Sequence, residues 1–289
     1  MRTFFPSVVR ILALGVNLLW KYFPPAGLAA AFVLPGVGVA QTGTVDARCS
    51  ENIYVALRRD LKIPLIWSPL EAYNILAESC TQWSHDPSLT LAAIAFDADA
   101  PEQKRIVAAI IDRSTMLVVS SYDLVSHDGS TKEEREQWGG YGELQIDTAR
   151  YQLANNVGAF ALRFERRQDN WSCANLRSGS ELTLLAAAGR NLRPVLALYM
   201  QQERALEGCL GTGRTFGTIA QSADLTIGVE KTSTNAFQDL TVTARITKTY
   251  YDVASQHVSS ESVERRKLRY DGRTYQLDGA QPWWLELIP

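Results

Sequence analysis

The clearest periodic pattern in the chain is an alternation of apolar and polar residues in its second half. From Leu240 to Thr247 every second side chain is apolar, and the residues between are threonines and one arginine. This spacing places the apolar side chains on one face of a β-strand and the polar ones on the other. Shorter versions occur at residues 160–164 and 225–229. These segments predict antiparallel strands that bury one face each.

Three further short runs are mainly apolar and predict buried strands. They cover Leu89–Phe96, Ile106–Ile111 and Met116–Tyr122. The middle run also permits a helix that begins at Pro101. Strands of these two kinds build sandwich or barrel-like sheets. We therefore predict a mainly β fold of antiparallel sheets, arranged as a sandwich or as a small propeller.

Apart from the alternative helix at Pro101, helices are predicted only between the first forty residues and the first strand. Ser50 can cap a helix that ends at Leu61. Ser68 and Glu71 have the spacing of a capping box, which predicts a second helix that ends near Cys80. The sequence therefore predicts a short N-terminal helical pair.

One ten-residue segment is repeated. Residues 144–153 (LQIDTARYQL) and 268–277 (LRYDGRTYQL) match at five positions without a gap. Asp147 and Asp271 stand where an aspartate side chain can accept hydrogen bonds from the backbone of a tight turn, so each copy predicts a hairpin. Two copies predict a duplicated β unit, and the alternative is chance similarity between two hairpins. The predicted divisions are a helical segment 41–88, a first β unit 89–177 and a second β unit 178–289.

The first forty residues have the composition of an export signal. Arg2 and Arg10 give a positive start, and a long apolar stretch follows. Gly38 and Ala40 supply the small residues that a signal peptidase recognises. We predict a signal peptide, residues 1–40, and a periplasmic mature protein. The alternative is an uncleaved membrane anchor, because the stretch is long enough to span a bilayer.

The charge balance argues against nucleic acid as a partner. Cleavage after Ala40 removes three basic and no acidic residues, which leaves 26 basic against 31 acidic side chains and a net charge of about −5. Binding to phosphates requires a basic surface instead. We expect no membrane span after cleavage, and no pattern in the sequence indicates an oligomeric state.

All four cysteines lie after residue 40, and an even number in an exported chain predicts two disulfides. Three pairings are open. We favour Cys49 with Cys80 and Cys173 with Cys209, because each bridge then closes a local loop.

No arrangement of residues is typical of a catalytic, cofactor or metal site. Residues 84–86 and 126–128 both read Ser-His-Asp, but a hydrolase triad converges from separate segments, so we interpret both as polar loops. The glycines at 211–217 lack the flanking strand and helix of a nucleotide-binding loop. The acids at 97–102 lack the spacing of a calcium loop. We expect no cofactor and no metal, and favour a protein that is not an enzyme.

Two features near the C-terminus suggest contacts. Trp283 and Trp284 are adjacent, so on a strand they point to opposite faces. One is expected to close the core, and the other is a candidate contact for a protein or a sugar. The basic run Arg265–Lys267 is expected to protect an exposed edge strand from pairing.

Three segments resemble a group of uncharacterised exported proteobacterial β-proteins. They are residues 89–97 (LTLAAIAFD), 142–165 (GELQIDTARYQLANNVGAFALRFE) and 268–284 (LRYDGRTYQLDGAQPWW). The resemblance implies export and one fold across most of the chain, and it carries no activity. The last hairpin is also similar to hairpins of periplasmic β-proteins, some of which inhibit lysozyme-like hydrolases.

The leading hypothesis is a non-enzymatic periplasmic binding or interaction protein, with an envelope protein or a glycan as its partner. The alternatives are an envelope hydrolase, an inhibitor of a lysozyme-like hydrolase, and an envelope assembly factor. The hypotheses differ in what they require of the structure. A hydrolase needs a pocket with perturbed acids, a binder needs an exposed apolar patch, and an assembly factor needs an open sheet edge.

Overall fold

The computed structural model describes residues 48–62, 75–97, 103–127, 143–165, 174–210, 217–251 and 256–288. The predicted signal peptide lies outside these residues, and so does Cys173. All of the described residues belong to one compact unit. Within the described part of the chain, no helix is long and apolar enough to cross a membrane.

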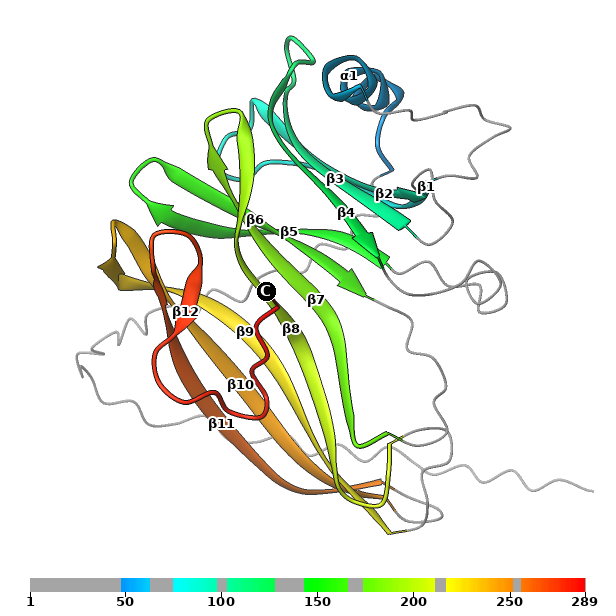
Figure 1. Cartoon of the computed structure of the whole chain (residues 1–289), viewed down its shortest axis with the longest axis vertical. Coiled ribbons are helices and arrows are strands. Elements are labelled where there is room, and N and C mark those ends of the chain that lie inside the picture. The colour runs from blue at the N-terminus through cyan, green and yellow to red at the C-terminus, as the bar shows by residue number, and fades with distance from the viewer. Residues whose placement is uncertain are drawn as a thin grey trace, which may run out of the picture. The chain divides into compact units, whose positions relative to one another are not determined.

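The described chain contains one helix followed by strands (Figure 1). The helix is α1 (Glu51–Leu61). The strands are β1 (Ile75–Gln82), β2 (Leu89–Asp97), β3 (Gln103–Asp112), β4 (Val118–His127), β5 (Glu143–Ala154), β6 (Val157–Glu165), β7 (Leu176–Ala188), β8 (Asn191–Glu207), β9 (Thr218–Thr234), β10 (Phe237–Tyr251), β11 (Gln256–Tyr270) and β12 (Tyr275–Leu277). The predicted mainly β class is therefore confirmed.

All of these strands join one sheet, which branches at β8. Its neighbours run β1-β2-β3-β4-β8-β9-β10-β11-β12, and β5, β6 and β7 form a second branch that also ends on β8. Every pairing is antiparallel except the single parallel contact of Ser121 with Asn191, which connects β4 to β8. The predicted division between residues 177 and 178 falls inside β7.

The branches stack so that three apolar cores lie between layers. One core lies between α1 and the first face of β1–β4. A second lies between the opposite face of β2 and β3 and the β5–β8 layer. The third and largest lies between β5–β7 and β8–β11. Strand β2 contributes Ile94 to the first core and Ala93 to the second, which is why it is apolar without a break from Leu91 to Phe96. The helix proposed as an alternative at Pro101 does not form from Gln103 onward, where β3 begins.

Only the first predicted helix is present in the described chain. Helix α1 begins after Ser50, whose backbone is extended, but the Ser50 side chain does not make the capping hydrogen bond that the sequence predicted. The helix is followed by Lys62 in the left-handed conformation. The second predicted helix is wrong over Ile75–Cys80, because these residues pair with β2 as an edge strand. The capping-box residues lie outside the described residues. Pairing with β2 therefore decides the structure of this segment, against its local helical signals.

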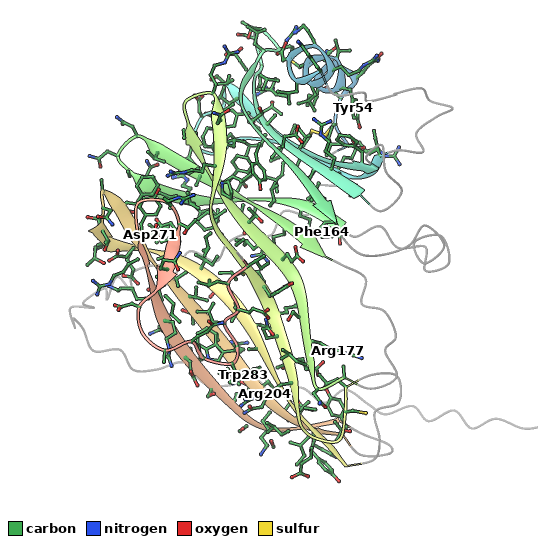
Figure 2. All side chains as sticks on the ribbon, in the orientation of Figure 1. Tyr54, Phe164, Arg177, Arg204, Asp271 and Trp283 are labelled. Atoms are coloured by element: carbon green, nitrogen blue, oxygen red, sulfur yellow. A yellow bond between two sulfur atoms is a disulfide. The ribbon has the colours of Figure 1, made fainter. Side chains whose placement is uncertain are left out.

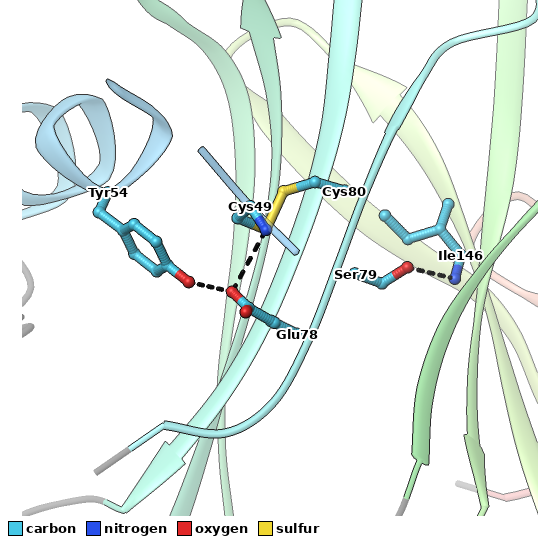
Figure 3. The surroundings of a disulfide bond; sticks show 6 residues. All are labelled: Cys49, Tyr54, Glu78, Ser79, Cys80 and Ile146. Carbon is cyan, nitrogen blue, oxygen red and sulfur yellow. Dashed lines mark hydrogen bonds between the residues drawn. A yellow bond between two sulfur atoms is a disulfide. The ribbon is translucent and has the colours of Figure 1, made fainter. Parts of the chain in front are cut away.

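A disulfide joins α1 to the sheet (Figure 3). Cys49, just before the helix, bonds to Cys80 in β1, as predicted. Tyr54 of α1 donates a hydrogen bond to the carboxylate of Glu78, which also accepts one from the backbone N–H of Cys49 at 3.4 Å. Burial and the Glu78 carboxylate raise the pKa of Tyr54 well above its ordinary value. The disulfide and the shared carboxylate hold the helix against the face of β1.

The two copies of the repeated segment differ in structure. The second copy is the predicted hairpin, with Tyr270 opposite Tyr275 and with Asp271 accepting backbone hydrogen bonds in the turn. The first copy is not a hairpin: it is one strand, β5, in which a bulge after Asp147 keeps the chain paired with β6. Asp147 accepts a backbone hydrogen bond from Ala149 at 2.9 Å. Both aspartates thus lead local turns, but only the second turn reverses the chain.

The C-terminal segment fills a gap beside β8. Strand β9 pairs with β8 only from Gln201 to Glu207. Before Gln201, Leu198 of β8 instead forms a bridge with Leu287 of the C-terminal segment. Two backbone hydrogen bonds flank this bridge, at 2.9 and 3.3 Å. Trp284 is fully buried beneath this segment and donates its indole N–H to Glu264 of β11 at 2.9 Å. The C-terminal segment therefore completes the largest core.

We predict that Trp284→Ala lowers the free energy of unfolding by about 3–5 kcal/mol, because it leaves a large cavity in the core and removes the indole hydrogen bond to Glu264. Urea denaturation would measure the change. Trp283→Ala is the matched control. That side chain is only half-buried, and its main polar contact is with Arg204, so we expect a loss of roughly 1–2 kcal/mol. Equal losses for the two variants would contradict this account.

Candidate functional site

The outer edge of β11 is open along most of its length. One side of β11 pairs with β10 from end to end. On the other side, β12 covers only Leu268–Tyr270, and among the described residues no strand pairs with the stretch Ser259–Lys267. A bulge at Ser259 marks the start of this stretch. Such an edge presents unpaired backbone groups to which another strand can add.

Hydrogen bonding identifies the backbone groups that point outward. The carbonyl of Lys267 accepts a hydrogen bond from the backbone N–H of Asp278, on the side away from β10. Successive residues of a strand direct their backbone groups to alternate sides. The N–H and C=O groups of Glu261, Val263 and Arg265 therefore also point away from β10. The open edge carries three residues with outward backbone groups.

The side chains of these three residues are exposed. Val263 is 60% exposed, the highest value among the large apolar side chains of the described chain, and it is flanked by an acidic and a basic residue. The neighbouring Glu264 and Arg266 lie on the opposite face, where both contact Trp284. On its outer face, the edge therefore presents Val263 between an acidic and a basic side chain. On its inner face, Glu264 and Arg266 attach the edge to the core.

The basic run lies where the sequence predicted it, on an exposed edge. Arg265 is exposed, whereas Arg266 forms an ion pair with Glu264 at 3.6 Å. Lys267 reaches back to the buried carboxylate of Asp239 at 3.8 Å. Charges on an edge hinder indiscriminate pairing, but they permit pairing with a strand of complementary charge.

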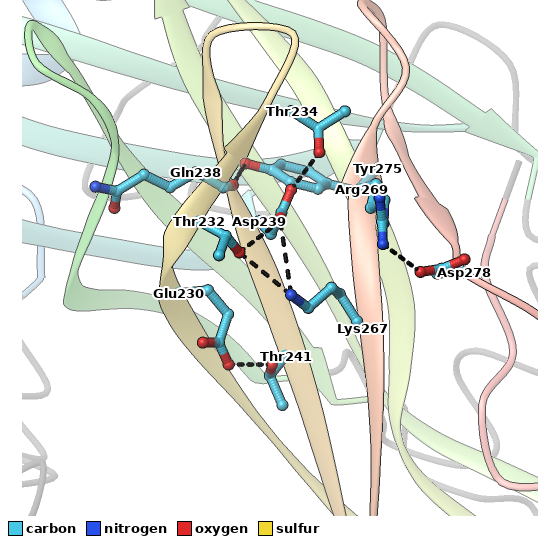
Figure 4. A network of polar contacts seen from close by, with 10 residues as sticks. All are labelled: Glu230, Thr232, Thr234, Gln238, Asp239, Thr241, Lys267, Arg269, Tyr275 and Asp278. Carbon is cyan, nitrogen blue, oxygen red and sulfur yellow. Dashed lines mark hydrogen bonds and ion pairs between the residues drawn. The ribbon is translucent and has the colours of Figure 1, made fainter.

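A polar network holds the end of the edge in place (Figure 4). Asp239, which is 3% exposed, accepts hydrogen bonds from the hydroxyls of Thr232 at 2.6 Å and Thr234 at 2.7 Å. Lys267 also donates to Thr232 at 3.2 Å. Burial alone would raise the pKa of Asp239, but the two hydroxyls and the lysine outweigh it and hold the pKa below its ordinary value. The network ties β9, β10 and β11 together.

The two tryptophans proposed as contacts have different environments. Trp284 lies in the core. The ring of Trp283 packs against the guanidinium of Arg204, 4.2 Å from ring centre to cation (Figure 2), and Arg204 also donates two hydrogen bonds to Gln221. One face of Trp283 is therefore already used to fasten the C-terminal segment to β8.

The remaining predicted residues occupy structural positions. Asp147 forms an ion pair with Arg163 at 3.2 Å, far along the chain from the exposed turn of Asp271. Cys209 is disulfide-bonded, but its expected partner, Cys173, lies outside the described residues. His85 is partly buried against Trp83, and burial, followed by the charge of Arg150, lowers its pKa.

Lowered aspartate pKa values have local causes. Asp112 accepts four hydrogen bonds from Ser114 and Thr115 in the β3–β4 turn, which lower its pKa to about 2. Arg59 and the backbone of Val118 do the same for Asp60, whose pKa is also about 2. These carboxylates stabilise turns and helix contacts. Among the described residues, no group of three or more His, Cys, Asp or Glu side chains could hold a metal ion.

Our reading of the sequence missed two residues that matter at this edge. Val263 is the single apolar residue in the polar run Ser259–Lys267, and that isolation was a usable signal. The sequence around Asp239 gave no signal, because the partners of Asp239 come from two other strands, β9 and β11. Comparison with known proteins adds no further assignment: no family model, no curated protein and no solved structure matches the chain.

We predict that the stability supplied by Asp239 is lost on acidification. Its folded-state pKa lies below the unfolded value of about 3.9, so the contribution is complete above that pH and disappears as the pH falls through the folded pKa. Asp239→Asn should cost about 1–3 kcal/mol at neutral pH and flatten the pH dependence of the unfolding free energy below pH 4 or so. The exposed Asp271→Asn serves as control and should cost less. An unchanged pH profile in Asp239→Asn would contradict the role of the network.

Amide hydrogen exchange tests whether the edge is open. In dilute protein, the outward amides of Val263 and Arg265 should exchange much faster than the inward amides of Ser262 and Glu264, which are bonded to β10. Exchange resolved by residue with nuclear magnetic resonance would show this alternation. Uniform protection along β11 would mean that the edge is covered.

Proposed function

We propose that the protein is an exported, non-enzymatic interaction protein of the cell envelope, which binds an extended polypeptide segment at the open edge of β11. The observation that carries the proposal is the row of outward backbone groups from Glu261 to Arg265, which no described strand pairs. A strand added there gains backbone hydrogen bonds, and its side chains meet a fixed pattern of charge and apolar surface. This joins the binding hypothesis with that of an assembly factor.

Two further features support an exported location. The Cys49–Cys80 disulfide is of a kind that forms and persists in oxidising compartments. The first forty residues have the composition of a signal peptide. We therefore propose the periplasm as the place where the edge meets its partner, after cleavage at Ala40.

Substitution at Val263 separates backbone pairing from side-chain contact. Val263→Pro removes an outward N–H that makes no bond to β10, so the fold is retained while strand addition is blocked. Val263→Thr keeps the donor and the β-branched shape. Unchanged unfolding midpoints would establish that both variants are folded.

The oxidised protein, purified after export, would serve as bait in an envelope extract of the cells that export it. We expect one stoichiometric polypeptide to be retained by the native protein and by Val263→Thr, and to be lost with Val263→Pro. Retention by Val263→Pro, or the absence of any retained polypeptide at high bait concentration, would overturn the proposal.

A further inference from the structure

We infer that the strand added at this edge is β11 of a second copy of the chain, paired antiparallel about a two-fold axis through Val263. The inference rests on the proposed function, since it names the partner of the same edge. It is carried by the order of the exposed side chains along β11. When two copies of the strand lie antiparallel, acidic side chains of one copy lie opposite basic side chains of the other.

The length of the open stretch places the two-fold axis. The stretch runs from the bulge at Ser259 to Lys267, where β12 begins to cover the edge, and Val263 is its central residue. With Val263 opposite its symmetry mate, Ser259 of one copy lies opposite Lys267 of the other. Pairing then ends at the bulge of one copy and at the β12 hairpin of the other.

The charges select the same register. With Val263 at the centre, Glu261 of each copy lies opposite Arg265 of the other, so two ion pairs flank a Val–Val contact on the outer face. On the inner face, Ser262 lies opposite Glu264, and Ser260 opposite Arg266. No like-charged side chains are directly opposed.

Neighbouring registers are worse. A centre at Glu264 would place that carboxylate opposite its own copy, and like charges directly opposite each other destabilise a strand pair. A centre at Ser262 would place Val263 opposite Glu261 and would lose both ion pairs. The native order of residues thus favours one register.

The backbone also fits this arrangement. The outward groups of Glu261, Val263 and Arg265 would meet those of Arg265, Val263 and Glu261 in the second copy, which gives about six hydrogen bonds. The exposed Val263 side chains would be buried against each other, which accounts for a large apolar residue at the centre of a polar edge.

Charge reversal tests the register, because both charged residues are exposed and their replacement does not disturb the core. Sedimentation equilibrium of the native protein should show a reversible dimer at micromolar concentration. Arg265→Glu and Glu261→Arg should each raise the dimer dissociation constant about tenfold or more, since each variant opposes like charges at two symmetric positions. Lys231→Glu, an exposed change on β9 of the same charge, should dimerise as the native protein does.

Mixing the two variants provides the decisive measurement. Arg265→Glu brings two acids and Glu261→Arg brings two bases, so an equimolar mixture should form a heterodimer of near-native affinity although neither variant dimerises well alone. Recovery in the mixture would support the inference. A native protein that stays monomeric, single variants that dimerise normally, or a mixture without recovery would each overturn it.

The outcomes separate this inference from the proposed function. If the purified protein is monomeric, but the envelope extract yields a different polypeptide that Val263→Pro fails to retain, the second copy is wrong and the interaction function stands. If the outward amides of β11 are protected in dilute monomer, the edge is not open, and both fail.

Discussion

Strand β8 lies inside the fold, so the backbone groups along both of its edges need hydrogen-bond partners. The arrangement of the other strands depends on which segments supply those partners. One side pairs with β7 along almost its full length. On the other edge, β9 pairs only with Gln201–Glu207. Before Gln201, the C-terminal segment bridges to β8 at Leu287, and β4 pairs with β8 at Asn191. Because unpaired backbone groups inside a core are costly, the branch point requires contributions from both β4 and the C-terminal segment.

The same requirement explains why one edge remains open. At β8 the missing partners would be buried, and the chain supplies them from its own C-terminus. At β11 the face that carries Val263 points away from the core, and Val263 is 60% exposed. Solvent can satisfy backbone groups at an exposed edge, so the fold does not require a strand there. The edge is therefore available for binding, and the protein does not lose stability when no partner strand is bound.

The polar network around Asp239 connects this edge to the fold. Lys267 contacts Thr232 of β9 directly and Thr234 through Asp239. Glu264 and Arg266 are held on the other face by Trp284. The last residues of the open stretch are thus fixed on both faces. These residues are therefore already ordered before a strand adds to them, so binding costs little conformational entropy on this side of the interface.

Local patterns in the sequence predicted the mainly β class, the first helix and the Asp271 hairpin, because each depends on periodicity or turn chemistry within a few residues. The small number of cysteines favoured the Cys49–Cys80 bridge. Three outcomes required the tertiary structure: Ile75–Cys80 is a strand, Asp147 leads a bulge, and Asp239 is buried. Those outcomes depend on which distant strand lies alongside, and no local pattern specifies that neighbour.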